Sequence, residues 1–447
     1  MKIFKIAFLI LFVFTNKPAT FKIAGLLDGT FGSDGTVLEK ITGRFEDARG
    51  VQVDSQGRIL VVAQVTYPDT FKKMTIVRFL SDGSLDVTFG TGGYSVLHIV
   101  RLDYSTCLVV QPDDSILVGG YNDNGPVIMH FLENGTLDPE FGVSGGYTIA
   151  TELTYVIIQD MTVDSQGRIV LVGYYYVGGH AFTVVRFTPL GQLDTTFGTG
   201  FLNGSSSLHG YSIFNFLGST EDICQAVTLD ASDNIILAGA LNNYAGVMKI
   251  LASNGHLDTS FGGGTGMYQN TSFGSGYASA NSVALDNQGR IVMGGFNNQA
   301  DQSFFLLRLL PSGLLDSTFG AHSGYSLYGF AGFTIGNGCT KVMIDALQRI
   351  VMAGYVVDGS GDNLFLVSRM NVDGLLDTSY GTNGFTTNFI QNDTNSSAYG
   401  GTLDGQGRAI LVGPAAVHDA LGLARYTIDY TFNYYKAQFV KQSLGLL

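Results

Sequence analysis

The chain has 447 residues, of which 45% are hydrophobic, only 14% are charged and 60 are glycines. This composition predicts many short strands and tight turns, and it argues against a disordered or helical chain. The formal net charge is -13, and no basic run is longer than Lys72 and Lys73. Because this leaves no basic footprint for phosphates, we expect no nucleic-acid partner.

Residues 1–20 are predicted to be a signal peptide. Lys2 and Lys5 precede an unbroken apolar run over residues 6–14, which matches a basic n-region and a short h-region. The run is too short to cross a bilayer, and we expect no other transmembrane span. Residues 15–19 lack a clean small-x-small cleavage pattern, so an uncleaved peripheral anchor is the alternative. We therefore expect a protein that is secreted, periplasmic or at the cell surface.

Residues 25–433 contain seven tandem copies of a unit of just under sixty residues, and residues 434–447 form a C-terminal tail. One marker, Leu-Asp-x-Thr/Ser-Phe-Gly, places its aspartates at Asp28, Asp86, Asp138, Asp194, Asp258, Asp316 and Asp377, with a degenerate eighth at Asp429. A second marker is a predicted hairpin whose first residues are Asp54, Gln111, Asp164, Asp230, Asp286, Asp345 and Asp404. Eight copies of one marker and seven of the other mean that the chain starts and stops within a unit.

Each unit is predicted to contain four strands, which in the first unit are residues 50–53, 58–63, 74–80 and 94–100. The Asp-x-Gln-Gly step between the first two is turn chemistry, because Asp bonds its own backbone and Gly accepts a positive φ. Residues 59–63 are apolar without alternation, so both faces of that strand should be buried. A blade pressed between two neighbouring blades meets this demand.

The offset ends of the chain favour a closed ring over an open solenoid. Residues 35–41 resemble a fourth strand without its first three, and residues 398–427 supply three strands with a poor fourth. Joined, they complete a seventh blade and cover exposed strand edges. The predicted fold is therefore all-β, a seven-bladed β-propeller of four-stranded antiparallel blades, closed by pairing of its N- and C-terminal strands.

Residues common to every unit are explained by folding. The marker phenylalanine recurs with one substitute, Tyr380, and is predicted to be core. A basic residue near the start of each marker recurs as Arg78, Arg186, Lys249, Arg308, Arg369 and Arg425, with His130 once. It usually lies eight residues before the marker aspartate, so we expect a repeated charge pair that locks each blade.

The cysteines and histidines do not predict a metal centre. Cys107, Cys224 and Cys339 are too far apart for a CxxC type of site, and we interpret them as buried apolar residues. The loop 358–363, rich in Asp and Gly, raises the alternative of a bound calcium ion. It lacks the EF-hand spacing and the terminal Glu, so an ordinary polar turn is favoured. We expect no cofactor.

These repeats resemble a known family. Residues 193–200, the hairpin 164–169 and the strand 182–187 are similar to the delta-60 repeat, and the similarity recurs in all seven units. The unit also looks like a longer relative of the NHL propeller unit. The resemblance implies a bacterial exported or surface protein with a propeller-like fold, and it implies no biochemical activity or catalytic motif.

The largest break in the repeat is the candidate binding site. Residues 200–225 make the third unit's connection longer than any other, and they contain His209, Tyr211, Phe214, Phe216, Glu221 and Asp222. Extra aromatic and charged side chains on a long loop would suit a ligand. The alternative is a decorated loop that packs on its own blade. As a surface loop, residues 203–218 should be dispensable for folding.

Two functions remain open. The first is an exported, monomeric scaffold or binding module for a protein, glycan or other ligand, which uses loops such as 121–124 and 242–244. The second is a propeller enzyme of the lactonase, lyase or hydrolase type, with its site at the central channel. No nucleophile elbow, phosphate loop or HExxH pattern appears in the sequence. An enzyme should place a cluster of non-repeated His, Asp, Glu or Arg at the channel mouth.

Overall fold

The computed structural model describes residues 24–429, except 43, 69–71, 98–101, 177, 202–208, 216–220, 274–275, 299–302, 392–394 and 417. The predicted signal peptide and the C-terminal tail lie outside the described residues. Within them, no helix is long and apolar enough to cross a membrane.

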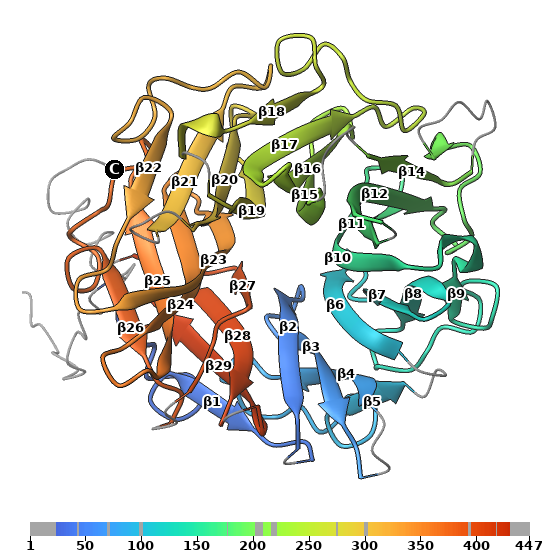
Figure 1. The fold of residues 1–447 in the computed structure, drawn as a ribbon. Helices are drawn as coiled ribbons and strands as arrows, with labels where there is room; N and C mark the ends of the chain where they lie inside the picture. Colours follow the sequence, from blue (N-terminus) through green and yellow to red (C-terminus); the bar gives the residue numbers. More distant parts are fainter. Residues whose placement is uncertain are drawn as a thin grey trace, which may run out of the picture.

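Seven sheets stand around a central axis and form a β-propeller (Figure 1). In blades 1, 2, 4, 5 and 6 the four strands are antiparallel and run outward from the axis in chain order, whereas blades 3 and 7 differ at the outer edge. Blade 1 contains β2 (Glu46–Val53), β3 (Ile59–Thr66), β4 (Lys72–Phe79) and β5 (Tyr94–Leu97). Blade 2 contains β6 (Leu102–Val110), β7 (Ile116–Asn122), β8 (Gly125–Phe131) and β9 (Tyr147–Ile149). Blade 4 contains β15 (Ile223–Leu229), β16 (Ile235–Leu241), β17 (Tyr244–Ile250) and β18 (Met267–Gln269).

The remaining blades follow the same order. Blade 5 contains β19 (Ala278–Leu285), β20 (Ile291–Asn297), β21 (Ser303–Leu309) and β22 (Tyr325–Tyr328). Blade 6 contains β23 (Thr334–Ile344), β24 (Ile350–Val357), β25 (Asn363–Met370) and β26 (Phe385–Asn388). Blade 7 contains β27 (Gly400–Leu403), β28 (Ala409–Ala415) and β29 (Ala420–Tyr426). Two short 3-10 helices, η1 (Thr151–Leu153) and η2 (Thr271–Phe273), lie in loops.

Blade 7 is completed by the N-terminal end of the chain, as predicted. Strand β1 (Thr36–Glu39) pairs antiparallel with β29, and Thr36 lies opposite Ala424. In Figure 1 the blue β1 lies beside the red β29. This pairing covers the outer edge of β29, which would otherwise expose unpaired backbone groups.

Blade 3 departs from the predicted four strands. It contains β10 (Val156–Val163), β11 (Ile169–Tyr176) and β12 (His180–Phe187), followed by β14 (Tyr211–Phe214) as the fourth strand. A fifth strand, β13 (Gly200–Phe201), pairs parallel with β14 at the outer edge. Residues 203–218 are therefore not a dispensable surface loop, because they include the whole of β14.

The hairpin between the first two strands of a blade is closed by its first residue, which we call the hairpin residue. In blade 1, the carboxylate of Asp54 accepts hydrogen bonds from the N–H groups of Gln56 (3.0 Å) and Arg58 (2.8 Å). Gly57 then adopts a φ of 79°, in the left-handed region that favours glycine. The turn therefore depends on both residues of the marker.

Three even-numbered blades replace this glycine with a larger residue. Asp114, Asp233 and Gln348 keep the left-handed φ, at 63°, 62° and 62°. In each case the side chain accepts a hydrogen bond from the preceding blade's hairpin, such as that from the Ser55 N–H to Asp114 (2.8 Å). A contact between blades thus offsets the cost of the backbone conformation.

The core consists of seven hydrophobic clusters, one at each seam between neighbouring blades in the described residues. Strand β3 shows why both faces are apolar, since Ile59 and Val61 pack against blade 7 while Leu60 and Val62 pack against blade 2. The marker aromatic residues are all buried, as predicted: Phe31, Phe89, Phe141, Phe197, Phe261, Phe319 and Tyr380.

Each repeated arginine forms the predicted charge pair within its own blade, and it also donates to a backbone carbonyl of the next blade. Arg186 is 1% exposed, and its Nε donates to Asp194 (2.8 Å). Its Nη1 donates to the carbonyl oxygen of Ala252 in blade 4, and its guanidinium lies 4.0 Å from the centre of the Phe197 ring. Arg78 and Arg308 repeat the ion pair and the contact with the next unit's carbonyl.

The two exceptions to this lock are coupled to a second change within the same blade. Five blades have arginine both in the third strand and four residues after the hairpin residue. Blades 2 and 4 have no arginine at either position. Blade 2 has His130 in the third strand and Ser115 after the hairpin residue, and blade 4 has Lys249 and Asn234 at the same two positions. The smaller side chain reaches the hairpin instead: Lys249 Nζ lies 2.8 Å from Asp230, and His130 Nε2 lies 3.0 Å from Ser115.

The cysteines are free and buried in the described structure, which agrees with their predicted role as apolar residues. The loop 358–363 joins β24 to β25 as a hairpin turn. The Asp358 carboxylate accepts hydrogen bonds from the N–H groups of Ser360 (2.8 Å) and Asp362 (3.1 Å). No group of three or more His, Cys, Asp or Glu side chains among the described residues could hold a metal ion.

Candidate functional site: the central channel

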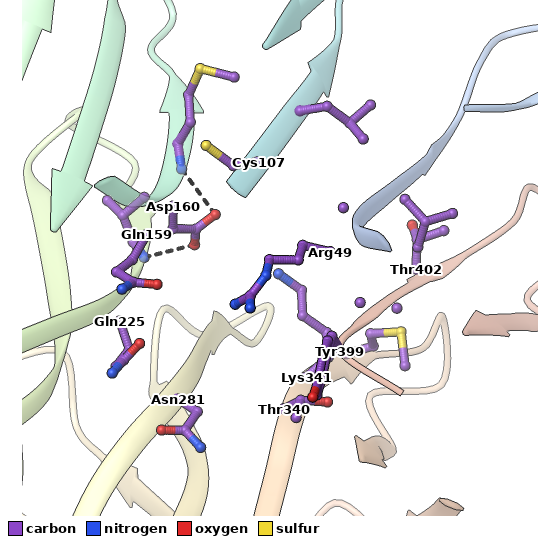
Figure 2. A pocket seen from close by; sticks show the side chains of 18 of the residues that line it. Arg49, Cys107, Gln159, Asp160, Gln225, Asn281, Thr340, Lys341, Tyr399 and Thr402 are labelled. Atoms are coloured by element: carbon purple, nitrogen blue, oxygen red, sulfur yellow. Dashed lines mark hydrogen bonds between the residues drawn. The ribbon is translucent and has the colours of Figure 1, made fainter. Parts of the chain in front are cut away.

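The innermost strands of all seven blades surround a cavity of about 810 Å³ on the propeller axis. These strands are β2, β6, β10, β15, β19, β23 and β27. The volume lies in the range of small-molecule sites. Figure 2 shows the labelled polar side chains around one common space, with Arg49 extending toward its middle.

A β-bulge in the inner strands places these side chains. In β10, Ile158 pairs with Gly173 and Asp160 pairs with Val172, so Gln159 between them has no partner residue. The same single-residue skip occurs in β2, β6, β15, β19 and β23. In blade 7, the Tyr399 N–H bonds to Val412, which also pairs with Gly400. A bulge of this kind leaves one residue outside the ladder and re-aims its side chain.

The bulge residue always lies five residues before the hairpin residue. The seven are Arg49, Thr106, Gln159, Gln225, Asn281, Thr340 and Tyr399. All except Thr106, whose side chain is not described, line the cavity. The residue just before each of these six is buried, so the bulge turns its own residue toward the open channel. This bulge ring differs in every blade except for the two glutamines and two threonines, whereas the marker residues of the unit repeat.

Two members of the bulge ring also join blades. Asn281 Nδ2 donates to the carbonyl oxygen of Cys339 (3.2 Å), and Thr340 Oγ1 donates to that of Ala398 (2.9 Å). These two side chains therefore have a structural role. Gln225 lines the cavity and has no hydrogen-bond partner among the described residues, so its amide is available to a ligand.

Arg49 is oriented by its neighbours. Its Nε and Nη2 donate to Asp47 Oδ2 at 3.1 and 2.9 Å, and its guanidinium lies 5.3 Å from the centre of the Tyr399 ring. Burial by itself lowers the pKa of Arg49, but the Asp47 carboxylate outweighs burial and the pKa is raised. The side chain is 40% exposed, so this fixed cation faces the channel.

The residue after the bulge adds two charges of opposite sign. Asp160 Oδ1 accepts the N–H of Met161 (2.9 Å), and its Oδ2 accepts the N–H of Val227 in the next blade (3.0 Å). Both carboxylate oxygens are thus engaged by backbone groups. Lys341 lines the same cavity, and its ammonium group makes no ion pair or hydrogen bond with the described residues.

Aromatic rings gather where the inner strands begin. Tyr277 and Phe296 have ring centres 5.8 Å apart, and Tyr355 and Tyr399 meet edge to face at 6.0 Å. All four line the cavity. Burial raises the pKa of both Tyr277 and Tyr399, which keeps these phenols neutral donors at ordinary pH.

This arrangement suits hydrogen bonding, stacking and ion pairing. The cavity lining among the described residues includes no histidine or glutamate, and Asp160 is its only carboxylate. A general acid and base pair needs two titratable groups that reach one reacting atom.

The six residues predicted as a binding loop are not brought together in this channel. Tyr211 and Phe214 are buried on β14, where Tyr211 faces the seam with blade 2 and Phe214 the seam with blade 4. His209 precedes β14, and its ring lies 5.7 Å from that of Tyr211. Phe216 lies outside the described residues.

The last two predicted residues lie near the start of β15. Asp222 is fully buried and accepts the N–H of Asn242 (2.8 Å), so it holds a hairpin turn. Glu221 Oε2 lies 2.9 Å from His180 Nδ1, without the alignment of a hydrogen bond. The His180 ring lies between those of Tyr174 and Tyr176, with centres 5.0 Å from each. Burial raises the pKa of Tyr277, and the Glu221 charge adds to the shift, which places Glu221 near the channel's aromatic end.

Comparison with known families supports the repeat and the fold. The model of a β-propeller domain of unknown function, DUF5122, matches residues 55–89, 111–141, 165–197 and 289–319. Each matched segment begins in or beside a hairpin marker and ends on a marker phenylalanine. The chain is a β-propeller repeat protein. No curated protein matches it.

Solved propellers resemble it only in overall architecture. An inactive virginiamycin B lyase from Staphylococcus aureus, solved with quinupristin, is 11% identical, with 88% of this chain and 99% of the lyase covered and a TM-score of 0.45. YCF48 bound to a D1 peptide is 9% identical, covering 92% and 99%, with a TM-score of 0.48. A PQQ-bound aldose sugar dehydrogenase from Streptomyces coelicolor is 10% identical, covering 73% and 95%, with a TM-score of 0.40. Enzymes and a peptide-bound protein both occur, so these similarities decide nothing about function.

The sequence contains the signal for the bulge ring, although loop length pointed elsewhere. Aligning the units on the hairpin residue places the ring in one column, five positions earlier. That column is polar and variable, and its neighbours are apolar or small except for Asp160 and Lys341. That these residues line the channel follows only from the structure, in which the bulge turns this column toward the axis.

Proposed function

We propose that this protein is an exported β-propeller binding module that takes a polar ligand into its central channel. The observation that supports it best is the bulge ring, a polar column of the repeat that varies between blades and lines one cavity. Gln225 and Lys341 contribute unengaged polar groups there, and the aromatic residues at one end offer apolar surface. A few placed polar groups on an apolar wall are the usual composition of a ligand site.

The proposal includes the finer assignments made from the sequence. The repeats are assigned to the delta-60 type, the leader with Lys2 and Lys5 is assigned to export, and the protein is expected to act as a monomer. A reporter fused after residue 25 should appear outside the cytoplasm. Retention of the reporter in the cytoplasm would remove export from the proposal.

Binding in the channel is tested with paired substitutions. Saccharides, peptides and small metabolites are screened by thermal shift, and each hit is measured by calorimetry. The double variant Gln159→Ala, Gln225→Ala should weaken binding by about tenfold or more, because both side chains line the cavity, Gln225 with an unengaged amide and Gln159 with an amide that also hydrogen-bonds Tyr174. Gln192→Ala removes the same group from an exposed outer turn and should bind like the parent.

Two results would overturn the proposal. Hits that bind the double variant as tightly as the parent would place the site outside the channel. Catalytic turnover of a hit by the parent, lost in the double variant, would make the channel an active site of the lactonase, lyase or hydrolase type instead.

A further inference from the structure

Two seams, between blades 3 and 4 and between blades 5 and 6, show how a channel-facing amide can be satisfied by the preceding blade. The Val227 N–H donates to Asp160 of the preceding blade (3.0 Å), and the Val342 N–H donates to Ser282 of its preceding blade (2.9 Å). Each donor lies three residues before its hairpin residue, and each acceptor lies four residues before the preceding one. At these two seams the inner strand presents an N–H toward the channel, and a side-chain oxygen of the preceding blade accepts it.

Blades 1, 2, 3, 5 and 7 have the donor position without a side-chain oxygen at the acceptor position of the preceding blade, and blade 7 is the one in which a cation stands there. Gly401 lies three residues before Asp404 and pairs with Leu411, just as Val227 pairs with Leu237 and Val342 with Met352. The preceding blade supplies Lys341 at the acceptor's position. An ammonium group only donates. The Gly401 amide and the Lys341 side chain are therefore two neighbouring donors, and neither can satisfy the other.

Arg49 flanks the same short strand from the other side. A Cβ on Gly400 would lie 2.4 Å from the carbonyl oxygen of Arg49, and a Cβ on Gly401 would lie 3.6 Å from the Cβ of Lys341. Two successive glycines thus leave the wall between the two cations free of side chains. Asp47 engages Nε and Nη2 of Arg49, which leaves Nη1 as a further donor.

The carboxylates near these cations are engaged elsewhere. Both oxygens of Asp160 accept backbone N–H groups, and Glu46 accepts those of Ile41 (3.0 Å) and Thr42 (2.7 Å). Asp47 serves Arg49. In a chain of net charge -13, Lys341 nevertheless lines the channel without a carboxylate partner among the described residues. Folding gives no reason for a cation at this position, where five other units have Gly, Cys, Ala or Ser and one has Asp.

We infer that the channel recognises a carboxylate group of its ligand between Lys341, Arg49 and the Gly401 amide. The inference rests on the proposed function, and it adds the chemical class of the ligand. A ligand carboxylate here would reproduce what Asp160 does at the seam of blades 3 and 4, where a carboxylate accepts channel-facing N–H groups. Charge-assisted hydrogen bonds to a guanidinium and an ammonium would strengthen the contact.

The carboxylate can belong to a small organic acid or to an acidic saccharide, and the probes separate these sources. Succinate represents the first, galacturonate and its short oligomers the second, and galactose is the neutral counterpart. Binding to the full chain is measured by calorimetry at low salt and at an ionic strength of about 0.15 M. We expect a carboxylate probe to bind and galactose to bind at least about tenfold more weakly. We also expect added salt to weaken the binding of the carboxylate probe.

Variants of Lys341 test the contact itself. Lys341→Met should weaken carboxylate binding by about tenfold or more, and Lys341→Arg should retain most of it because the charge and donors remain. The matched control is Lys40→Met, which makes the same charge change at an exposed position after β1. Far-UV circular dichroism and thermal melting show whether each variant is folded.

The outcomes separate this inference from the proposed function. The inference is wrong if no carboxylate probe binds, or if Lys341→Met binds carboxylates like the parent. If a neutral ligand binds as well as its acidic counterpart and depends on Gln159 and Gln225, the channel proposal stands without the carboxylate. If every ligand binds the double variant Gln159→Ala, Gln225→Ala as tightly as the parent, the channel proposal itself fails.

Discussion

At the scale of single residues, the repeated arginine does three things at once. Arg186 pairs with Asp194, donates to the next blade's backbone at Ala252 and lies against the ring of Phe197. Each contact satisfies part of a guanidinium that is almost fully buried. A charge in such a place is tolerated because nearly every donor finds an acceptor.

Arg186→Ala should therefore destabilise the fold. The substitution leaves the buried Asp194 carboxylate and the Ala252 carbonyl without their partner, which we expect to cost about 3–5 kcal/mol of unfolding free energy. Urea denaturation measures the change, with Lys40→Ala as the exposed control. Binding per folded molecule should be unchanged, since Arg186 does not line the channel. A parent-like denaturation midpoint combined with lost binding would contradict the structural role.

At the scale of elements, the fourth strand of blade 3 corrects the expectation that residues 203–218 are an expendable loop. Deleting them removes β14, and with it the buried side chains of Tyr211, Ile213 and Phe214. Losing one buried aromatic residue costs about 3–5 kcal/mol, so the deletion should unfold blade 3 or the whole ring. Soluble expression and thermal melting measure this. A stable, cooperatively melting deletion variant would show that β14 is dispensable.

Ring closure by β1 predicts a specific crosslink. Thr36 and Ala424 lie directly opposite each other, so the pair Thr36→Cys and Ala424→Cys should form a disulfide on oxidation. Closing nearly the whole chain into a loop should stabilise it by about 5–6 kcal/mol in the chain-entropy model. Mass spectrometry and urea denaturation with and without reductant measure both effects.

The register supplies the control for this crosslink. Glu39 pairs with Leu421, so the mismatched pair Glu39→Cys and Ala424→Cys should not crosslink. The native cysteines are buried and should not interfere. Equal crosslinking of the matched and mismatched pairs would argue against the closed register.

At the scale of the whole molecule, the same aspartate carboxyl recurs in the repeated units, so that its effect on the pH dependence of stability is summed. Burial raises the pKa of the marker carboxyls, but the hydroxyl and N–H of the Thr or Ser two residues later, together with the repeated cation, outweigh burial and lower it. This holds for Asp86, Asp194, Asp258, Asp316 and Asp377. A carboxyl whose pKa is lowered on folding stabilises the fold above its unfolded pKa of about 3.9.

Stability should therefore be lost steeply in acid. These carboxyls contribute fully above pH of about 4, and their contribution disappears as the pH falls through the lowered folded pKa values. Each extra proton bound by the unfolded chain adds about 1.4 kcal/mol per pH unit to the slope. Urea denaturation at several pH values measures this slope, and Asp194→Asn should reduce it. An unfolding free energy that is flat down to pH of about 2 would contradict the summed effect.

The sequence by itself determined the architecture, because a repeated unit must repeat its local structure. The markers, the two-sided apolar strands and the half-unit offset were enough to predict seven blades and the closure by residues 35–41. The buried Phe197 and the Arg186 pair were predicted for the same reason. Residues that recur in every unit are the ones that the fold requires.

Only the tertiary structure decided where the candidate site lies. Gln159, Gln225 and Tyr399 belong to different units, and nothing local to any one unit shows that they face the same space. The bulge turns them inward, and the ring brings the seven inner strands to one axis. The length of the segment before Asp230 instead drew attention to β14, at the outer edge of blade 3. A long loop shows only that residues are inserted at one place in the chain. Which residues share a channel depends on the register of the inner strands and on closure of the ring, and both are properties of the whole fold.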